Sequence, residues 1–153
     1  MNNIVILENI RSAYNVGNII RTADALGWQV RLTWYTPSPA DTQKVVKTSL
    51  GAETNVGLKQ FGHTPEAITS AKDLWLLVIA AEITKDSVSL AEMKKGNHPS
   101  IAIIFWNEVD GVLESTLKLV DQVVHIPMQG MKESLNVGQS SAIFMRACNQ
   151  LCA

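Results

Sequence analysis

The chain has 153 residues, a length typical of one domain, with 46% hydrophobic and 18% charged residues. This composition excludes a disordered chain, a coiled coil and a collagen-like fibre. The 13 Lys and Arg residues nearly balance the 14 Asp and Glu residues, so the net charge of −1 gives no sign of the basic footprint typical of sequence-blind nucleic-acid binding. The low charged fraction leaves room for apolar surface that a partner covers.

No targeting or membrane signal is visible. The longest apolar run, residues 74–81, is far shorter than the roughly 20 residues that span a bilayer. Residues 1–4 include no basic region and no cleavage site of a secretion signal. Cys148 and Cys152 lie one helical turn apart and form no CxxC pair. We expect a reduced, cytoplasmic protein without a membrane segment.

Apolar runs suited to buried strands alternate with helical patterns along the chain. The first half predicts a strand at residues 4–7, a helix near residues 19–26 that ends at Gly27, a strand at 29–35 and a helix at 41–50. The second half predicts a helix from Thr64 to about Lys72, strands at 74–80, 101–106 and 123–126, and a last helix that begins near Leu135 or Asn136. Such alternation predicts an α/β fold with a mostly parallel sheet flanked by helices.

Ligands of parallel sheets bind beyond the carboxyl ends of the strands, so the polar loops after Leu7, Trp106 and Ile126 are where we expect chemistry. The first of these loops leads to Asn15 and Arg21. In one interpretation, Asn15 caps a helix and Arg21 pairs with Asp24 or another surface carboxylate. In the other, Arg21 lies among apolar residues because it faces a cleft.

The second loop, residues 105–112, carries Glu108 at the end of a predicted buried strand. A carboxylate in this place could orient a cation or bind a hydroxyl group. The same loop also fits an ordinary strand-to-helix turn with its bend at Asp110 and Gly111.

The third loop, residues 126–137, is punctuated by Pro127 and Gly130 and leads directly into a predicted helix. Ser134 and Asn136 are both good helix-capping residues. Free backbone groups at such a helix start can bind an adenine or a carboxylate. The methionines of this loop either line an apolar pocket or fill the core.

Motifs of other ligand-binding classes are absent from the sequence. It contains no phosphate-binding P-loop, no dinucleotide-binding glycine pattern and no HExxH zinc motif. His63, His98 and His125 show no metal-ligand spacing, and His125 fits a structural role inside a strand. We therefore expect no metal site.

Taken in this order, the three loops resemble the three motifs of the SpoU/TrmH-type SPOUT RNA 2′-O-ribose methyltransferases. The first motif is Asn15-x-Gly17-x-x-x-Arg21 and continues to Gly27, the second surrounds Glu108, and the third runs from Ile126-Pro127-Met128 to Ser134-Leu135-Asn136-Val137. Residues 47–53 resemble the family's stretch between the first two motifs. The resemblance covers nearly the whole chain.

The resemblance implies a fold, an activity and an assembly. The implied fold is an α/β domain with a deep trefoil knot at its C-terminal end, and residues 1–153 would form a single methyltransferase domain without an appended RNA-binding domain. The implied activity is methylation of a ribose 2′-hydroxyl of tRNA or rRNA with S-adenosyl-L-methionine and no metal. The implied assembly is a homodimer with active sites at the subunit interface.

The resemblance also assigns roles to single residues. Arg21 matches the family's general base; because arginine stays protonated, we expect it to bind a substrate phosphate and position the 2′-hydroxyl. Asn15 would position the ribose or Arg21, and Glu108 would orient Arg21 or the RNA. Ser134 and Asn136 would shape the catalytic end of the cofactor pocket. The residues expected to hold the cofactor are Phe105, Trp106, Asn107, Gly111, Ile126, Met128, Ser134, Leu135 and Asn136. The residues expected to contact RNA are Arg11, Tyr14 and Arg21.

One departure from the family pattern concerns Trp106, since the second motif normally has glycine after the position of Phe105. A glycine there lets the backbone approach the cofactor. Trp106 either turns outward to stack on a base or crowds the pocket. An alternative function is therefore a catalytically degenerate RNA- or nucleotide-binding homodimer of the same fold. A third is an ordinary doubly wound domain that binds another small ligand. Tyr14, Trp34 and Tyr35 are further aromatic residues that either stack on bases or simply pack.

Overall fold

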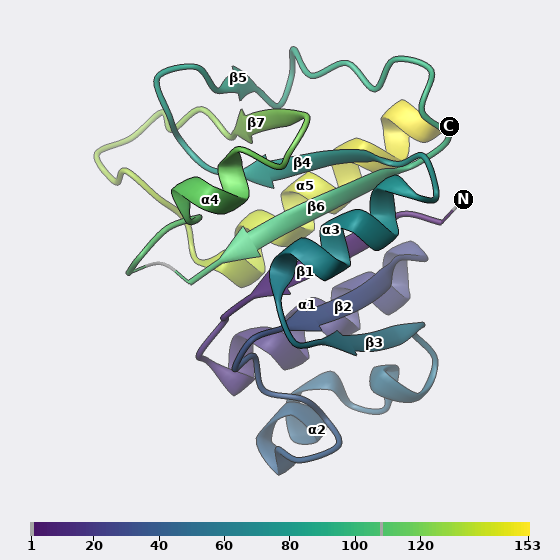
Figure 1. Cartoon of the computed structure of the whole chain (residues 1–153). Helices are drawn as coiled ribbons and strands as arrows, with labels where there is room; N and C mark the ends of the chain where they lie inside the picture. The colour runs from purple at the N-terminus through teal and green to yellow at the C-terminus, as the bar shows by residue number, and fades with distance from the viewer. Residues whose placement is uncertain (1, 108) are drawn as a thin grey trace.

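The computed structural model describes residues 2–107 and 109–153. Its centre is a parallel sheet whose strands follow the order β3-β2-β1-β6-β4-β7-β5 (Figure 1). The strands are β1 (Ile4–Glu8), β2 (Gln29–Thr33), β3 (Leu58–Phe61), β4 (Leu77–Ala81), β5 (Val88–Ser89), β6 (Ile101–Trp106) and β7 (Gln122–His125). Because all described strand pairs are parallel, their carboxyl ends lie at one edge of the sheet.

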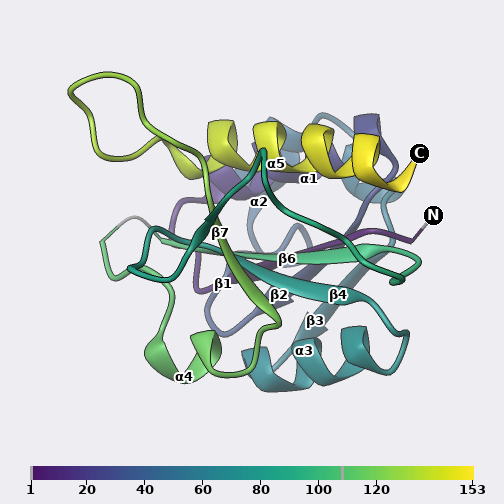
Figure 2. The same cartoon turned by 90° about the horizontal axis from the view of Figure 1, so that it is seen from above.

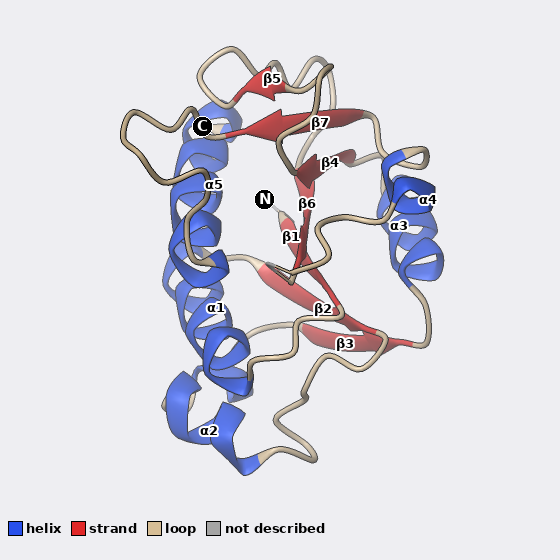
Figure 3. Cartoon of the chain, turned by 90° about the vertical axis from the view of Figure 1, so that its left-hand side faces the viewer, coloured by secondary structure: helices blue, strands red, loops and turns tan. Residues whose placement is uncertain are grey.

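Helices cover both faces of this sheet (Figures 2 and 3). One face carries α1 (Ala13–Leu26), α2 (Gln43–Ser49) and α5 (Val137–Cys152), and a short 3-10 helix (Ala52–Thr54) follows α2. The other face carries α3 (Thr64–Lys72) and α4 (Glu114–Leu117). The expected α/β fold with a parallel sheet flanked by helices is confirmed.

The central strands are apolar throughout because both of their faces are buried. In β1, Val5 and Leu7 belong to the core beneath α1 and α5, whereas Ile4 and Ile6 belong to the core beneath α3. This alternation follows from the two-residue period of a strand. Burial of each such side chain contributes roughly 1.5–3 kcal/mol, so these layers dominate the stability of the fold.

Several predicted boundaries are wrong. The strand predicted at residues 74–80 begins only at Leu77, because Leu74 and Trp75 form an exposed turn in which the Trp75 N–H donates to the Lys72 carbonyl (2.8 Å). Helix α1 begins at Ala13, several residues before the apolar pattern becomes visible. Strands β3 and β5 and helix α4 were not predicted, because all three are short and at least partly exposed.

The ends of the two long helices follow their sequence signals. Gly27 closes α1 in the left-handed conformation (φ 73°), as its position predicts. Asn136 caps α5, which confirms the predicted start of the last helix. Both cysteines are free, and burial raises the pKa of Cys148 to about 12, with a smaller effect from Cys152. Among residues 2–107 and 109–153, no helix is both long and apolar enough to cross a membrane.

Candidate active site

Two adjoining cavities lie at the carboxyl edge of the sheet, where β4, β6 and β7 end beside the start of α5. The first, of about 120 Å³, is lined by Ile126 and Met128 after β7. The second, of about 150 Å³, is lined by residues of the second loop, namely Phe105, Trp106, Asn107 and Gly111. Ser134 and Leu135 line both cavities. The structure thus brings all predicted cofactor residues except Asn136 to one place.

Glu82 also lines both cavities, although the sequence analysis did not select it. Its carboxylate accepts hydrogen bonds from the backbone N–H groups of Ile83 (2.9 Å) and Val112 (3.0 Å), which ties the end of β4 to the loop after β6. Gly111 permits this approach, because its φ is 67° and an added Cβ would lie 2.7 Å from the carboxylate. The signal in the sequence that could have identified Glu82 is its position as a charged residue directly after the buried strand β4.

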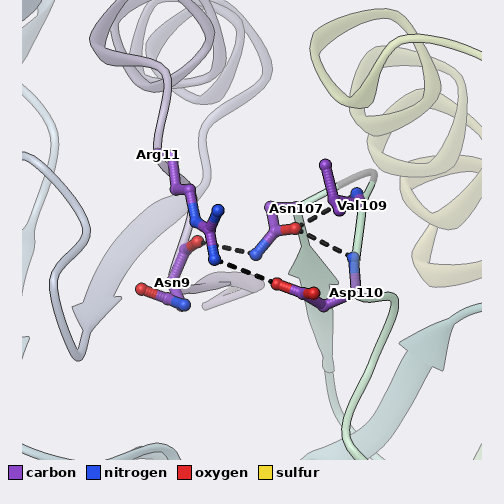
Figure 4. A network of polar contacts seen from close by, with 5 residues as sticks. All are labelled: Asn9, Arg11, Asn107, Val109 and Asp110. Atoms are coloured by element: carbon purple, nitrogen blue, oxygen red, sulfur yellow. Dashed lines mark hydrogen bonds and ion pairs between the residues drawn. The ribbon is translucent and has the colours of Figure 1, made fainter.

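The loops after β1 and β6 are fastened together by polar contacts (Figure 4). The buried Asn107 donates from Nδ2 to the Asn9 carbonyl (3.2 Å), and its Oδ1 accepts from the N–H groups of Val109 and Asp110 (3.1 Å each). At the surface, Arg11 pairs with Asp110 at 3.2 Å. Such an exposed pair contributes at most about 1 kcal/mol, so Asp110 holds Arg11 only weakly. Glu108 lies outside the described residues.

The amide side chains of the first and third motifs meet at the start of α5. Asn136 Oδ1 accepts from the Gly138 N–H (2.8 Å), and Asn136 Nδ2 donates to Asn15 Oδ1 (3.3 Å). Asn15 itself is not a helix cap, because Ser12 caps α1 and accepts the Asn15 N–H at 3.2 Å. The interpretation of Asn15 as a cap is therefore wrong.

A groove of about 840 Å³ between α1 and α5 contains Arg21. Tyr14, Asn136 and Arg146 line the same groove. Arg21 is exposed and forms no ion pair with any residue in the described part of the chain, so the predicted pairing with Asp24 is wrong. Two arginines in one groove, with no acidic side chain among its described lining residues, favour an anionic ligand. Arg11 lies apart from this groove, in the fastened loops.

Residues 2–146 match the model of the SpoU rRNA Methylase family. The chain belongs to this family. The match confirms the resemblance seen in the three motifs and replaces the interpretation as an ordinary doubly wound domain.

Two relatives of this SpoU family protein are named as tRNA (guanosine(18)-2′-O)-methyltransferases. The one from Thermus thermophilus is 32% identical over 142 residues, covering 92% of this chain and 71% of the relative. The one from Escherichia coli is 29% identical over 143 residues, and the chain spans only 60% of its length.

Solved structures show the SpoU fold at lower sequence identity. An S-adenosylmethionine-bound rRNA methyltransferase from Sinorhizobium meliloti has a TM-score of 0.88 at 23% identity, covering 97% of this chain and 56% of that chain. A structure described as giving insight into 2′-hydroxyl methylation of C/U34 on tRNA has a TM-score of 0.79 at 22% identity, covering 98% and 95% of the two chains.

Trp106, the departure from the SpoU motif, is buried. Its side chain packs with Ala80 and Val112 in a small core cluster, and its indole Nε1 has no hydrogen-bond partner among the described residues. The expectation that Trp106 stacks outward on a base is therefore wrong. It lines the second cavity from the core side. Within residues 2–107 and 109–153, no group of three or more His, Cys, Asp or Glu side chains is placed to hold a metal ion.

Proposed function

We propose that this protein transfers the methyl group of S-adenosylmethionine to a ribose 2′-hydroxyl of tRNA or rRNA. The observation that carries the proposal is the position of residues 134–140 at the start of α5. They line both cavities at the sheet edge and also the groove that contains Arg21. A cofactor site and a site for an anionic substrate therefore share one helix start, and the relatives' names support this assignment.

The residues around the two cavities fit S-adenosylmethionine. Ile126, Met128 and Leu135 offer apolar side chains, and Ser134 offers a hydroxyl group, for the mixed surface of a nucleoside. Glu82, which lines both cavities, would accept hydrogen bonds from ribose hydroxyls. Phe105, Asn107 and Gly111 would complete the pocket. When bound, the cofactor supplies a methyl group already activated on a sulfonium.

The chain's own task is then to orient the ribose and assist removal of its proton. Arg21 would bind a phosphate of the RNA and so fix the neighbouring 2′-hydroxyl. Asn15 and Asn136, which hydrogen-bond to each other, would hold that end of the groove in place. Glu108 would orient Arg21 or the RNA. Arg11 and Tyr14, which both precede the first motif, would add contacts to the substrate.

We also propose that the protein is a homodimer whose second copy covers the outer side of α1 and α5. Ile143 is a large apolar side chain exposed on α5, which agrees with the low charged fraction. Residues 1–153 would form one methyltransferase domain. The knot implied by the resemblance fits the path of the chain: after β7 it returns through a protruding loop (Figure 2), and α5 packs beside β6 and α1.

The proposed activity is tested by incubating the protein with methyl-labelled cofactor and bulk tRNA or rRNA. We expect label in nucleotides whose 3′ phosphodiester bond resists alkaline hydrolysis, because a 2′-O-methyl group blocks that reaction. Arg21→Ala should abolish transfer and leave cofactor binding, measured by calorimetry, nearly unchanged. Lys118→Ala, on the opposite face of the sheet, is the control and should transfer normally.

Two results would contradict this assignment. Cofactor and RNA binding without any transfer would replace it with the non-catalytic binding homodimer. Loss of both transfer and cofactor binding in Arg21→Ala would show that Arg21 belongs to the cofactor pocket instead of the substrate site.

A further inference from the structure

We propose that Trp34 and Tyr35, together with His63, form a platform on which an unpaired base of the RNA stacks. The inference rests on the function proposed above, since it assigns a site to nucleotides that flank the modified one. Trp34 and Tyr35 directly follow β2, and 45% and 86% of their surfaces are exposed. His63 follows β3 and directly precedes α3. These three residues are called the Trp34 platform.

The turn that carries the platform is held rigidly. The Thr36 N–H donates to the Thr33 carbonyl (3.2 Å), which closes the turn around the two aromatic residues. Thr36 Oγ1 donates to the Leu7 carbonyl (3.0 Å) and accepts the Ile10 N–H (3.1 Å), which fastens the turn to the loop after β1. A binding surface that is already ordered loses little entropy when a ligand arrives.

Trp34 adopts a backbone conformation that is unusual for a large residue. Its φ of 55° lies in the left-handed region, which side chains other than those of Gly, Asn and Asp rarely occupy. Its ring meets His63 edge to face, with centroids 5.0 Å apart and planes at 80°, so this contact covers at most one face of the indole. The exposed Trp75 shares this conformation, so the assignment of Trp34 rests on its position at the carboxyl edge of the sheet, whereas Trp75 lies before β4 at the opposite edge.

The platform lies at the same edge of the sheet as the cavities. Strand β2 is two positions from β6 in the sheet, so Trp34 emerges about 10 Å from the second loop along that edge. The loop fastened to the platform also carries the exposed Arg11, next to Ile10. An aromatic surface and a cation along the same edge of the sheet suit a single RNA strand, of which one base stacks while a phosphate pairs with Arg11.

Base stacking on the Trp34 platform also fits the near-zero net charge of the chain. With a net charge of −1, the protein lacks the broad positive field that would hold RNA by its backbone alone. Stacking on aromatic rings supplies affinity that does not depend on charge, and it accepts any base because each base has a π face. The occupant favoured here is therefore single-stranded RNA. The test must also detect the other case, in which a second copy of the protein covers the platform.

The test measures the affinity of a fluorescein-labelled single-stranded oligouridylate by anisotropy. Trp34→Ala and Tyr35→Ala should each weaken binding by roughly 5- to 150-fold, the range found when a stacking aromatic is removed. The slope of affinity against salt should not change in these variants, whereas Arg11→Ala should reduce it, because Arg11 neutralises a phosphate and the two aromatic side chains do not. Trp34→Phe should restore most of the affinity.

Trp75 provides a matched control. It is 63% exposed, has a φ of 59° and contacts His98 with ring centroids 5.8 Å apart, but it lies before β4 at the opposite edge of the sheet. Trp75→Ala should bind the oligonucleotide like the wild type. A second variant, Trp75→Phe, leaves Trp34 as the exposed tryptophan, because Trp28 and Trp106 are buried. RNA binding should therefore quench the tryptophan fluorescence of this variant.

Four results would overturn the platform. They are wild-type affinity in Trp34→Ala, an equal loss in Trp75→Ala, a changed oligomeric state in Trp34→Ala by sedimentation, and the absence of RNA binding in the wild type. Failure of the proposed function looks different: the wild type would bind RNA through Trp34 yet transfer no methyl group. Conversely, methyl transfer with an unchanged KM for RNA in Trp34→Ala contradicts the platform alone.

Discussion

At the scale of single residues, Glu8 and Trp106 are two buried side chains with polar atoms at the carboxyl edge of the sheet. Glu8 ends β1 and is buried, with one carboxylate oxygen accepting from Thr116 Oγ1 at 2.7 Å and the other without a hydrogen-bond partner among the described residues. Trp106 is its register partner on β6, and its Nε1 likewise has no partner in that part of the chain. An unmatched acceptor and an unmatched donor thus lie on neighbouring strands at the carboxyl edge of the sheet.

Glu8 makes stability depend on pH. Burial raises the pKa of its carboxyl group, and the hydrogen bond from Thr116 only partly opposes this shift. The folded protein therefore holds the proton more tightly than the unfolded chain, and the free energy of unfolding falls as the pH rises through the unfolded-state pKa towards the folded one. Glu8→Gln cannot ionise, so we expect it to gain stability over the wild type as the pH rises from about 5 to 8.

Urea denaturation at several pH values measures this difference. Glu92→Gln, which changes an exposed carboxylate, is the control and should follow the wild-type pH dependence. A stability difference between Glu8→Gln and the wild type that is constant with pH would show that Glu8 is not the titrating group.

At the scale of elements, the glycine of the first motif serves packing between helices. Gly17 lies inside α1, where a Cβ would come within 2.5 Å of Thr48 Cβ and 2.8 Å of the Val45 carbonyl oxygen on α2. The sequence marks Gly17 as part of a functional motif, but its contacts show that it allows α1 and α2 to approach each other. The motif thereby also sets the position of α1, which carries Asn15 and Arg21.

Gly17→Ala should lower the free energy of unfolding by about 1–3 kcal/mol, because the close contact with backbone outweighs the better helix propensity of alanine. Chemical denaturation measures this loss. Gly130→Ala, where an added Cβ would meet no atom within 4 Å, should have little effect. A Gly17→Ala variant as stable as the wild type would mean that α2 can shift without cost.

At the scale of the whole molecule, the proposed dimer accounts for exposed apolar surface on one face. Ile143 on α5 is 44% exposed on the outer side of the helix layer, and Leu119 after α4 is 39% exposed on the other face of the sheet. Ile143→Glu should shift the protein from dimer to monomer in sedimentation velocity, since a charge buried in an interface is costly. Leu119→Glu should leave the dimer intact. If both variants sediment like the wild type, the dimer interface lies elsewhere.

The sequence indicated most residues of the candidate site, but not which of them contact each other. Spacing alone indicated the three loops, and the structure places their described residues around the adjoining cavities and the groove. Spacing did not reveal Glu82, because its place in the site depends on a hydrogen bond from the Val112 N–H, which lies 30 residues away in the sequence. Of the two interpretations of Asn15, the one as a helix cap was wrong, because the nearby Ser12 caps α1 instead.

The sequence by itself determined the parallel α/β architecture and the edge of the sheet that carries the loops. Strands buried on both faces need continuous apolar runs, and that pattern is local. Only the tertiary structure decided that Trp106 turns into the core, that Arg21 lies in a groove between two helices, and that Trp34 is exposed on a rigid turn. These outcomes depend on contacts between segments far apart in the chain, which local periodicity does not encode.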